Sequence, residues 1–409
     1  MIKQRKNKTI IIAGGGTGGH IYPGLAIGRE VKKQHPDIEV LFVGAVGGLE
    51  EKIVPREGFP LVTLPIGKLH RSAGLSTRLK TLFLVPWALM RALWVLVRVR
   101  PLAVLGVGGY ASGPLLLMAS ILGVRSIIWE PNAYPGLANR LLARWVDECL
   151  VVFGEASRHL NARKIVEAGL PVRDSIRPAN LGTDPADLSM SQTRASSGGT
   201  GPTSRREGAL RVLIFGGSQG ARFLNDVVSS MIVEKSQELT GFKFVHQSGS
   251  ADYDRIKKIY QKSDRIDFKL ENRHTDTGQR VASQEKSATC VHLFEYLNDM
   301  DARYRWADIV ICRAGASTVA EICASHKAAI FVPLPTAADD HQKKNAEVLV
   351  NKHAAFMIEQ KDLSVGSLFG LLKKIENQPV MIEDLEKEVA KFKFPNAAKR
   401  IVEHLIVND

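Results

Sequence analysis

The chain has 409 residues, of which 45% are hydrophobic and 24% charged, so it can bury a sizeable core and its length favours two domains. An excess of 55 Lys and Arg over 42 Asp and Glu gives a net charge of +13, which favours nucleic acid, anionic lipid or a phosphorylated ligand as partner. The four cysteines lack the spacing of a zinc site or a disulfide scaffold, and the basic N-terminus lacks the long apolar run of a secretory signal.

Predicted strands and helices alternate in the first half of the chain. Apolar, β-branched runs predict strands at residues 9–13, 39–44, 103–107, 126–129 and 148–153. A helix is expected at about residues 25–33, between the first two strands. This alternation predicts a doubly wound parallel sheet in a first domain that spans residues 1–178.

A change of composition separates this half from a second one. Residues 179–208 are dense in Ser, Thr, Gly, Pro and Asp, which predicts a flexible linker. A second domain is expected over residues 209–391, with a polar insertion at about residues 262–288. Its strands are predicted at residues 212–215, 243–246, 308–312 and 329–332. A last helix, in the segment of about residues 392–409, is expected to pack back on the first domain.

Residues 58–129 contain no Asp or Glu but eight Lys or Arg, although the average density would place about seven acids there. The centre of this window, residues 79–98, reads LKTLFLVPWALMRALWVLVR. Its two tryptophans and flanking basic residues predict that a segment of about residues 67–100 contacts an anionic membrane surface. A buried core helix with a basic end is the alternative. A transmembrane span is disfavoured, because Arg91 interrupts the apolar run.

Two glycine-rich loops each follow a predicted strand and precede a helix-compatible stretch. Residues 9–20 read TIIIAGGGTGGH, and residues 212–222 read VLIFGGSQGAR. Such loops present backbone N–H groups to an anion at a helix N-terminus, where the helix dipole also favours negative charge. They predict two Rossmann-like halves that face one cleft. Purely structural tight turns are the alternative.

The first loop also matches the G-x-G-x-x-G fingerprint of NAD-dependent oxidoreductases at residues 14–19. That fold needs an acidic residue at the end of the second strand to bind the ribose hydroxyls. The second predicted strand is followed instead by Ala45, and the nearest acids, Glu50 and Glu51, come later. This absence weakens the dehydrogenase interpretation. A P-loop ATPase is unsupported, because neither loop contains the Gly-Lys-Ser/Thr sequence.

Four further motifs follow in a fixed order. Residues 106–114 read GVGGYASGP, residues 130–139 read EPNAYPGLAN, residues 169–173 read GLPVR and residues 313–321 read RAGASTVAE. With the two glycine loops, they closely resemble the MurG family, whose members add N-acetylglucosamine to the undecaprenyl-pyrophosphoryl-MurNAc-pentapeptide precursor of peptidoglycan. The resemblance runs through nearly the whole chain, except for the linker and the insertion.

This resemblance implies a GT-B fold, with two Rossmann-like α/β domains facing a cleft. It implies UDP-N-acetylglucosamine as donor and an inverting transfer to the 4-hydroxyl of undecaprenyl-linked MurNAc-pentapeptide. No cofactor, no obligatory metal and no nucleic acid are implied, whereas cell-wall synthesis proteins are possible partners. The expected location is the cytoplasmic face of the bacterial inner membrane, as a peripheral protein.

His20 is the candidate general base, because imidazole titrates near neutral pH and the loop holds it at a helix start. Orienting an acceptor phosphate or capping the helix is its alternative role. The resemblance implies that Thr17, Gly18 and Gly19 lie near the sugar or the acceptor diphosphate. Helix capping is the alternative for Thr17.

Four residues match donor contacts of the family. Asn132 matches a donor-sugar contact, with a turn-forming asparagine as alternative. Arg173 resembles a nucleotide contact, with an exposed surface arginine as alternative, and Ser218 matches the contact with the UDP phosphates. Glu321 is expected to accept hydrogen bonds from both ribose hydroxyls, and a favourable interaction with the helix dipole is its alternative.

The start of the same predicted helix is expected to surround the nucleotide through backbone N–H groups. The residues concerned are Ala316, Ser317, Thr318 and Val319, and the resemblance also implies that Ala320 binds substrate. Leu297 matches a position that reads uracil through its backbone, although the family usually carries Phe-Ile where this chain has Tyr296 and Leu297. Gln342 matches a donor-sugar contact. The nearby acids, Asp339 and Asp340, are interpreted as a solvated turn rather than a metal site.

Three other classes of protein were weighed against this interpretation. A related GT-B glycosyltransferase acting on another lipid, such as a diacylglycerol galactosyltransferase, would share the fold and some loops. A nucleic-acid-binding protein would fit the charge, but the chain has no zinc-finger spacing, RNP motif or basic repeat. A dehydrogenase ranks third, for want of the ribose acid.

Overall fold

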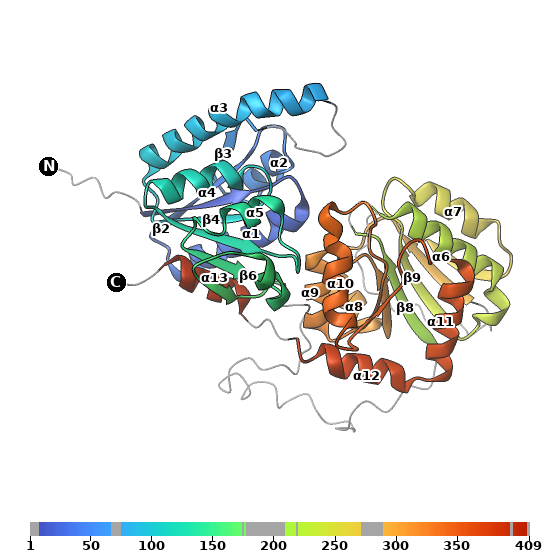
Figure 1. Ribbon diagram of the computed structural model, residues 1–409. Coiled ribbons are helices and arrows are strands. Elements are labelled where there is room, and N and C mark those ends of the chain that lie inside the picture. Colours follow the sequence, from blue (N-terminus) through green and yellow to red (C-terminus); the bar gives the residue numbers. More distant parts are fainter. Residues whose placement is uncertain are drawn as a thin grey trace.

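The computed structural model describes residues 8–66, 75–173, 176, 209–217, 220–270, 289–392 and 396–406, with the backbone alone for residues 75–83. These residues form two α/β domains, each built on a seven-stranded sheet. In Figure 1 the first domain runs from blue to green and the second from yellow-green to red, except that the C-terminal helix lies on the first domain.

The first sheet has the strand order β3-β2-β1-β4-β5-β6-β7, and all of its pairings are parallel. Its strands are β1 (Lys8–Gly14), β2 (Ile38–Ala45), β3 (Leu61–Leu64), β4 (Ala103–Gly108), β5 (Arg125–Glu130), β6 (Glu148–Val151) and β7 (Ile165–Glu167). Five of them overlap the predicted strands. The short edge strands β3 and β7 were missed, because neither carries the continuous apolar run of a strand buried on both faces.

Helices cover both faces of this sheet. They are α1 (Gly18–Gln34), α2 (Glu50–Arg56) and α13 (Ala397–Leu405) on one face and α3 (Leu75–Val99), α4 (Ser112–Ile121) and α5 (Leu137–Leu142) on the other. Alternation along β1 shows the two layers, because Ile10 and Ile12 pack with α1 whereas Ile11 and Ala13 pack with α4. The predicted start of α1 was wrong by seven residues, since its first turn contains glycines, which have low helix propensity.

The second sheet has the order β10-β11-β9-β8-β12-β13-β14 and is also parallel throughout. Its strands are β8 (Leu210–Phe215), β9 (Phe242–Gln247), β10 (Ile266–Leu270), β11 (Thr289–Phe294), β12 (Ile309–Cys312), β13 (Ala328–Phe331) and β14 (Phe356–Met357). Its helices are α6 (Arg222–Glu234), α7 (Tyr253–Gln261), α8 (Met300–Trp306), α9 (Ala316–Ser325), α10 (His341–Val350), α11 (Val365–Asn377) and α12 (Val380–Val389). The apolar cores place α6, α7 and α11 on one face and α8, α9 and α10 on the other.

The edge strand β10 corrects one interpretation of the sequence. It lies within the stretch of residues 262–288 that was interpreted as a polar insertion, and it pairs with β11. Phe268 of β10 packs on Tyr260 of α7 with the ring centroids 5.6 Å apart. The strand was missed because an edge position leaves its polar residues partly exposed. Residues 271–288 and the predicted linker at residues 179–208 lie outside the described residues.

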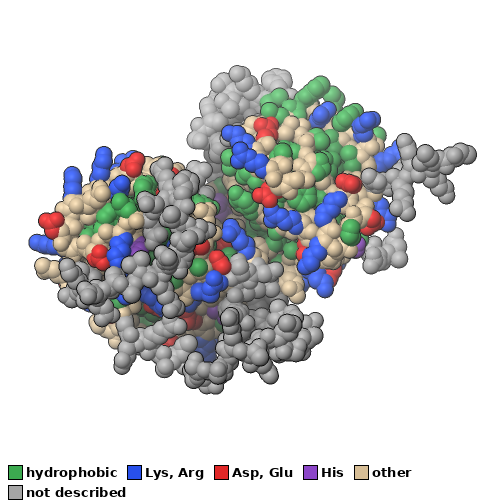
Figure 2. All heavy atoms as spheres, turned by 180° about the vertical axis from the view of Figure 1, so that it is seen from behind, with side chains coloured by type: hydrophobic (Ala, Val, Ile, Leu, Met, Phe, Trp, Pro, Cys, Tyr) green, Lys and Arg blue, Asp and Glu red, His purple; other side chains and the backbone are tan. Residues whose placement is uncertain are grey.

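The helix α3 has one buried and one exposed apolar face. Ala88, Ala92 and Val95 are buried in the core, whereas Trp87 is 57% and Trp94 is 51% exposed. In Figure 1 this helix forms the top of the first domain, and Figure 2 shows hydrophobic and basic side chains interspersed along the upper edge of that domain. The buried face fits the alternative of a core helix, and the contact with an anionic membrane surface stays a prediction. Within the described residues, no helix combines the length and apolar character that a membrane span requires.

The C-terminal helix α13 joins the first domain. It lies against α1 and β4, with Ile401, Val402 and Leu405 buried. The Arg125 guanidinium holds it by donating from Nε and Nη2 to the His404 carbonyl oxygen, at 3.0 and 2.7 Å. The chain therefore enters the second domain once and returns to the first at its end.

Candidate active site

The first glycine loop places His20 in the first turn of α1. Its Nδ1 lies 3.2 Å from the Gly15 carbonyl oxygen and 3.4 Å from Thr17 Oγ1. A carbonyl oxygen can only accept, so Nδ1 carries the proton of the neutral ring and Nε2 keeps its lone pair. The ring packs against Gly108, where a Cβ atom would lie 2.8 Å from Nε2. This tautomer suits a general base.

The protonation of His20 also fits such a role. Burial lowers the pKa of His20, while the bond to Gly15 and the charge of Glu130 raise it and the charge of His341 lowers it further. The ring is therefore neutral at neutral pH and able to accept a proton. Thr17 occupies the N-cap position of α1, but its side chain makes no capping bond and faces His20 instead. Gly18 and Gly19 form the start of the helix.

A buried carboxylate organises the loop that carries Asn132. Glu130, at the end of β5, accepts through Oε1 from Asn132 N at 2.9 Å and from Asn132 Nδ2 at 3.1 Å. Its Oε2 accepts from Gly136 N at 3.0 Å and from Asn139 Nδ2 at 2.8 Å. The position of Asn132 is thus fixed by more than turn propensity. Glu130 was not predicted as a site residue, although Glu130 opens the EPNAYPGLAN motif.

Asn345 of α10 connects this loop to the second domain. Its Oδ1 accepts from Ala133 N at 2.8 Å, and its Nδ2 donates to Asn132 Oδ1 and to the Ala314 carbonyl oxygen, both at 3.2 Å. Asn345 itself is fully buried. Asn345 was not predicted from the sequence either, because the partners that link it to the first domain, Ala133 and Asn132, lie about 210 residues away.

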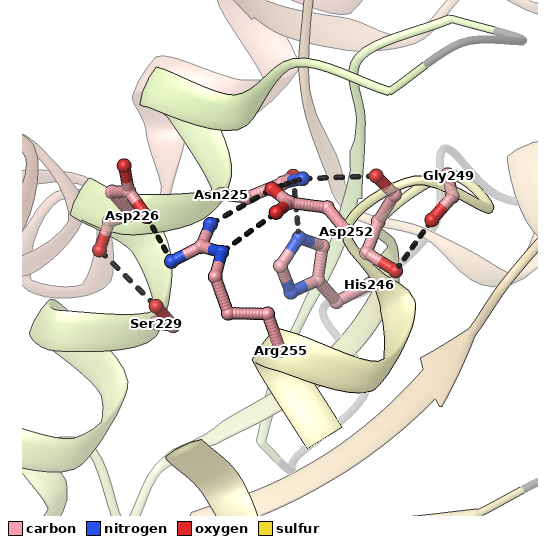
Figure 3. A network of polar contacts seen from close by, with 8 residues as sticks. Asn225, Asp226, Ser229, His246, Gly249, Asp252 and Arg255 are labelled. Atoms are coloured by element: carbon pink, nitrogen blue, oxygen red, sulfur yellow. Dashed lines mark hydrogen bonds and ion pairs between the residues drawn. The ribbon is translucent and has the colours of Figure 1, made fainter. Parts of the chain in front are cut away.

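The second glycine loop is held by a buried polar network behind it. Ser218 lies outside the described residues, but the flanking Gly220 has a φ of +76° and leaves no room for a side chain, since a Cβ atom would lie 2.2 Å from the Ser248 carbonyl oxygen. Asn225 Nδ2 donates to that carbonyl at 2.9 Å and to Asp252 at 2.8 Å. Figure 3 shows how this network, with His246 and Arg255, ties α6, β9 and α7 together. Burial lowers the pKa of His246 to about 3, so it is a neutral structural residue.

Gln247 joins two predicted donor loops. Its Nε2 donates to the Gly217 carbonyl oxygen at 3.1 Å, and its Oε1 accepts from Leu297 N at 3.1 Å. Leu297 is the predicted uracil contact and Gly217 belongs to the predicted diphosphate loop. The backbone N–H of Leu297 is thus already paired. Gln247 was also missed, because a glutamine at a strand end has no distinctive pattern.

A cavity of about 340 Å³ lies beside the second glycine loop. Its lining residues are Gly216, Gly220, Ala221, Arg222, Phe223, Arg313, Leu334, Gln342 and Gln360. Arg313 is buried and donates to the carbonyl oxygens of Val332 and Pro333 and to Gln360 Oε1. Burial lowers the pKa of Arg313, and no described carboxylate forms an ion pair with it. A bound diphosphate would supply the missing negative charge.

The helix α9 carries the other predicted nucleotide contacts. Glu321 accepts from the hydroxyl of the buried Tyr304 at 2.9 Å. Burial raises the pKa of Glu321, whereas the Tyr304 hydroxyl and the charge of Arg173 lower it. Arg173 is exposed, and its charge acts on the buried carboxyl group of Glu321 from the other domain.

Not all of the predicted N–H donors of α9 are free for a ligand. Val319 N already donates to the Gly315 carbonyl oxygen at 2.9 Å, and the side chains of Val319 and Ala320 are buried in the core. The expectation that Val319 binds the nucleotide through its backbone N–H is therefore wrong, whereas the substrate contact of Ala320 stays a prediction. Ala316, Ser317 and Thr318 stand in the first turn of α9, where backbone N–H groups lack helical partners.

The remaining predicted residues lie at the start of α10. Gln342 lines the cavity, and its Oε1 accepts from Leu334 N at 3.0 Å. Asp339 pairs with Arg140 of the first domain at 3.2 Å. No group of three or more His, Cys, Asp or Glu that could hold a metal ion occurs among the described residues.

Comparisons with known proteins agree with this geometry. Residues 10–151 match the glycosyltransferase family 28 N-terminal domain, and residues 211–401 match the glycosyltransferase family 28 C-terminal domain. The UDP-N-acetylglucosamine–N-acetylmuramyl-(pentapeptide) pyrophosphoryl-undecaprenol N-acetylglucosamine transferase of Bdellovibrio bacteriovorus is 42% identical over 400 residues, covering 98% of this chain and 99% of that protein. The enzyme of the same name from Anaeromyxobacter sp. (strain Fw109-5) is 36% identical over 394 residues, covering 96% of this chain and 92% of its own.

A solved structure extends these matches to the fold. Acinetobacter baumannii MurG superposes with a TM-score of 0.72 at 25% identity, covering 97% of this chain and 98% of that one. The predicted GT-B architecture of two parallel α/β domains is confirmed by this likeness and by the two sheets. The chain belongs to glycosyltransferase family 28 and, within it, to the MurG family.

Proposed function

We propose that this protein transfers N-acetylglucosamine from UDP-N-acetylglucosamine to the 4-hydroxyl of the muramyl sugar in undecaprenyl-pyrophosphoryl-MurNAc-pentapeptide. The observation that carries the proposal is the proximity of His20 to donor-side residues at the domain junction. His341 lies close enough to contribute to lowering the pKa of His20, after the larger effect of burial. The same helix carries Gln342 and Asn345, and Asn345 contacts Asn132. A base and three side-chain amides thus share one junction.

The donor half of the reaction requires groups that stabilise the departing UDP. As the bond from the anomeric carbon to the phosphate oxygen breaks, negative charge builds up on the diphosphate. Arg222 and Arg313 line the cavity beside the second glycine loop, where the N-terminus of α6 adds a favourable dipole. Glu321 would hold the ribose hydroxyls, with Arg173 nearby. These groups support an inverting displacement of UDP.

The acceptor half requires a base on the opposite side of the sugar. We assign that role to His20 Nε2, which holds a lone pair because Nδ1 donates to Gly15. The acceptor oxygen forms its bond to the anomeric carbon as its proton passes to Nε2, and the electron pair of the broken bond leaves with UDP. The single displacement inverts the configuration at that carbon.

The lipid acceptor also calls for a membrane contact, which we assign to the exposed face of α3. Trp87, Met90, Trp94 and Val97 are all more than half exposed on this helix. The Arg91 guanidinium lies over the Trp94 ring at 4.7 Å, so a cation accompanies the apolar surface. This combination fits a peripheral contact with anionic lipid at the cytoplasmic face of the inner membrane.

The proposal is tested by transfer of labelled sugar from UDP-N-acetylglucosamine to a polyprenyl-linked muramyl pentapeptide, with diacylglycerol as a parallel acceptor. We expect product from the muramyl lipid alone. At saturating acceptor, His20→Ala should lower turnover by about 100-fold or more, because general base catalysis contributes that much. His35→Ala, at the other end of α1, is the matched control and should stay within twofold. Transfer to diacylglycerol alone would refute the muramyl lipid as acceptor, and normal turnover of His20→Ala would refute His20 as the general base.

A further inference from the structure

The carboxylate of Glu50 lies beneath the first glycine loop and has no role in the mechanism above. Glu50, the first residue of α2, is only 1% exposed. Its Oε1 accepts from Ala45 N at 2.8 Å and its Oε2 accepts from Gly16 N at 2.9 Å. Both carboxylate oxygens therefore bind backbone N–H groups. A buried carboxylate placed this way needs an explanation.

Three glycines make room for this carboxylate. A Cβ atom would lie 2.2 Å from Glu50 Cδ at Gly15, 2.4 Å from Cγ at Gly44 and 2.3 Å from Oε2 at Gly48. No side chain fits at any of these positions while Glu50 stays in place. Gly15, which stands between the first two glycines of the apparent dinucleotide fingerprint, thus admits a carboxylate of the same chain. That carboxylate occupies an N–H group that an external diphosphate would otherwise bind.

The carboxylate is connected to His20 through one stretch of backbone. Glu50 accepts a hydrogen bond from Gly16 N. The preceding residue, Gly15, is also fixed, because its own N–H donates to the Gly108 carbonyl oxygen at 3.2 Å. The Gly15 carbonyl oxygen then receives the proton on Nδ1 of His20 at 3.2 Å. Moving the Gly15–Gly16 peptide would therefore change the hydrogen bond that selects the histidine tautomer.

We propose that Glu50 is a positioning residue, which holds the Gly15–Gly16 peptide so that His20 keeps its proton on Nδ1 and presents a free Nε2. The catalytic consequence rests on the proposed function, whereas the tautomer itself does not. Three charged or titratable groups act on His20, namely Glu130 after β5, His341 at the start of α10 and Glu50 on α2. Glu50 is the one that is bonded to the loop itself.

The first test measures the tautomer of His20 directly, by nitrogen NMR of histidine-labelled protein. The variant His20→Gln identifies the signal of His20. In the unaltered protein we expect a protonated Nδ1 and an unprotonated Nε2. Glu50→Gln keeps the shape but has one accepting oxygen in place of two, so it should give a mixture of tautomers. Glu51→Gln is the matched control, because the carboxylate of this exposed neighbour bonds Gly47 N at 3.0 Å and no other described residue, so the signal should stay unchanged. An unchanged tautomer in Glu50→Gln would overturn the proposal.

The second test is kinetic. Glu50→Gln should lower kcat at least tenfold while the affinity for UDP changes less than twofold. The acid limb of the pH profile should also move to lower pH, because the charge of Glu50 raises the pKa of His20 and the amide removes that charge. A loss of folded protein alone would lower activity equally at every pH. In a His20→Ala background, Glu50→Gln should cause no further loss of turnover, and a full additional loss would overturn the proposal.

A second variant covers the case in which Glu50→Gln does not fold. Gly48→Ala keeps the carboxylate but places a methyl group 2.3 Å from the position of Oε2, so the carboxylate must shift. We expect the same mixture of tautomers and the same fall in kcat. If His20→Ala keeps normal turnover while Glu50→Gln still alters the tautomer, the base assignment fails and the positioning role stands.

Discussion

Burial of the Glu321 side chain, on α9, controls its protonation. Burial raises the pKa of Glu321, and the Tyr304 hydroxyl and Arg173 only oppose this effect. As pH falls, the carboxylate is therefore protonated sooner than an exposed glutamate would be. A protonated carboxyl group accepts hydrogen bonds from the ribose hydroxyls less well than the carboxylate does. The residue that we assign to the ribose should thus make nucleotide binding sensitive to pH.

We predict that UDP binding weakens as pH falls from neutral through the raised pKa of Glu321, and that Glu321→Gln loses this dependence. The variant should also bind UDP about 10- to 100-fold more weakly at neutral pH, which is the usual effect of losing a charged hydrogen-bond acceptor. Isothermal titration calorimetry across the pH range measures both effects. Glu347→Gln on α10 is a control that should bind like the unaltered protein. Equal pH dependence in the Glu321 variant would contradict the assignment.

Residues with a local signature were the predictable part of the candidate site. His20 and Glu321 each follow a strand and a glycine turn, so their position at a helix start can be read from neighbouring residues. Gln247 and Asn345 could not be found in that way. Their partners are Leu297, 50 residues from Gln247, and Ala133, 212 residues from Asn345. Such contacts depend on the packing of whole domains rather than on local pattern.

At the scale of elements, α3 shows how a single helix can serve the core and an external surface. Ala88, Ala92 and Val95 are buried, and Ala92 and Val95 belong to the apolar cluster that α3 shares with α4 and the sheet. Trp87 and Trp94 are on the exposed side. Leaving two tryptophans in water is unfavourable in a monomer unless another surface covers them.

We predict that Trp94→Glu lowers binding to vesicles of anionic lipid by tenfold or more, because it removes apolar area and adds a repelling charge. Sedimentation with vesicles at low salt measures the effect. Val380→Glu on α12 is the matched control, since Val380 is 56% exposed on the other domain and undergoes the same change of charge. Activity toward a short-chain, water-soluble acceptor should be retained in both variants. If the Trp94 variant bound vesicles like the control, α3 would not be the contact.

Central strands were easier to predict than edge strands, for a physical reason. A parallel strand covered on both faces, such as β1 or β12, needs apolar residues at nearly every position. The edge strand β10 has one hydrogen-bonded neighbour and partly exposed side chains, so its residues alternate too weakly to stand out. Element types in the centre of each sheet could thus be predicted, and the sheet margins could not.

At the scale of the whole molecule, side-chain contacts at one junction relate the two domains. Asn345 bonds Ala133 N and Asn132, and Asp339 pairs with Arg140 nearby. The largest cluster of buried apolar residues also contains members from both domains. The side-chain amide of Asn132, which we assign to donor binding, is therefore positioned by a residue of the other domain. A change at this junction should affect donor binding without any direct contact with the nucleotide.

We predict that Asn345→Ala raises the KM for the sugar nucleotide about tenfold, because the buried Ala133 N–H loses its partner at a cost of about 1–3 kcal/mol and Asn132 is released. The affinity for free UDP, which lacks the sugar, should change much less. Steady-state kinetics and UDP titration measure the two quantities. Asn351→Ala, at the exposed end of α10, is the control and should match the unaltered protein. An equal loss of UDP affinity would contradict the role at the junction.

The return of α13 to the first domain bears on how the protein is made. Ile401, Val402 and Leu405 cover part of α1 and β4, yet they follow the whole second domain in the chain. While the second domain is being synthesised, the first domain therefore lacks part of its apolar cover. The helix carrying His20 gains its final packing only after the second domain and α13 have emerged from the ribosome.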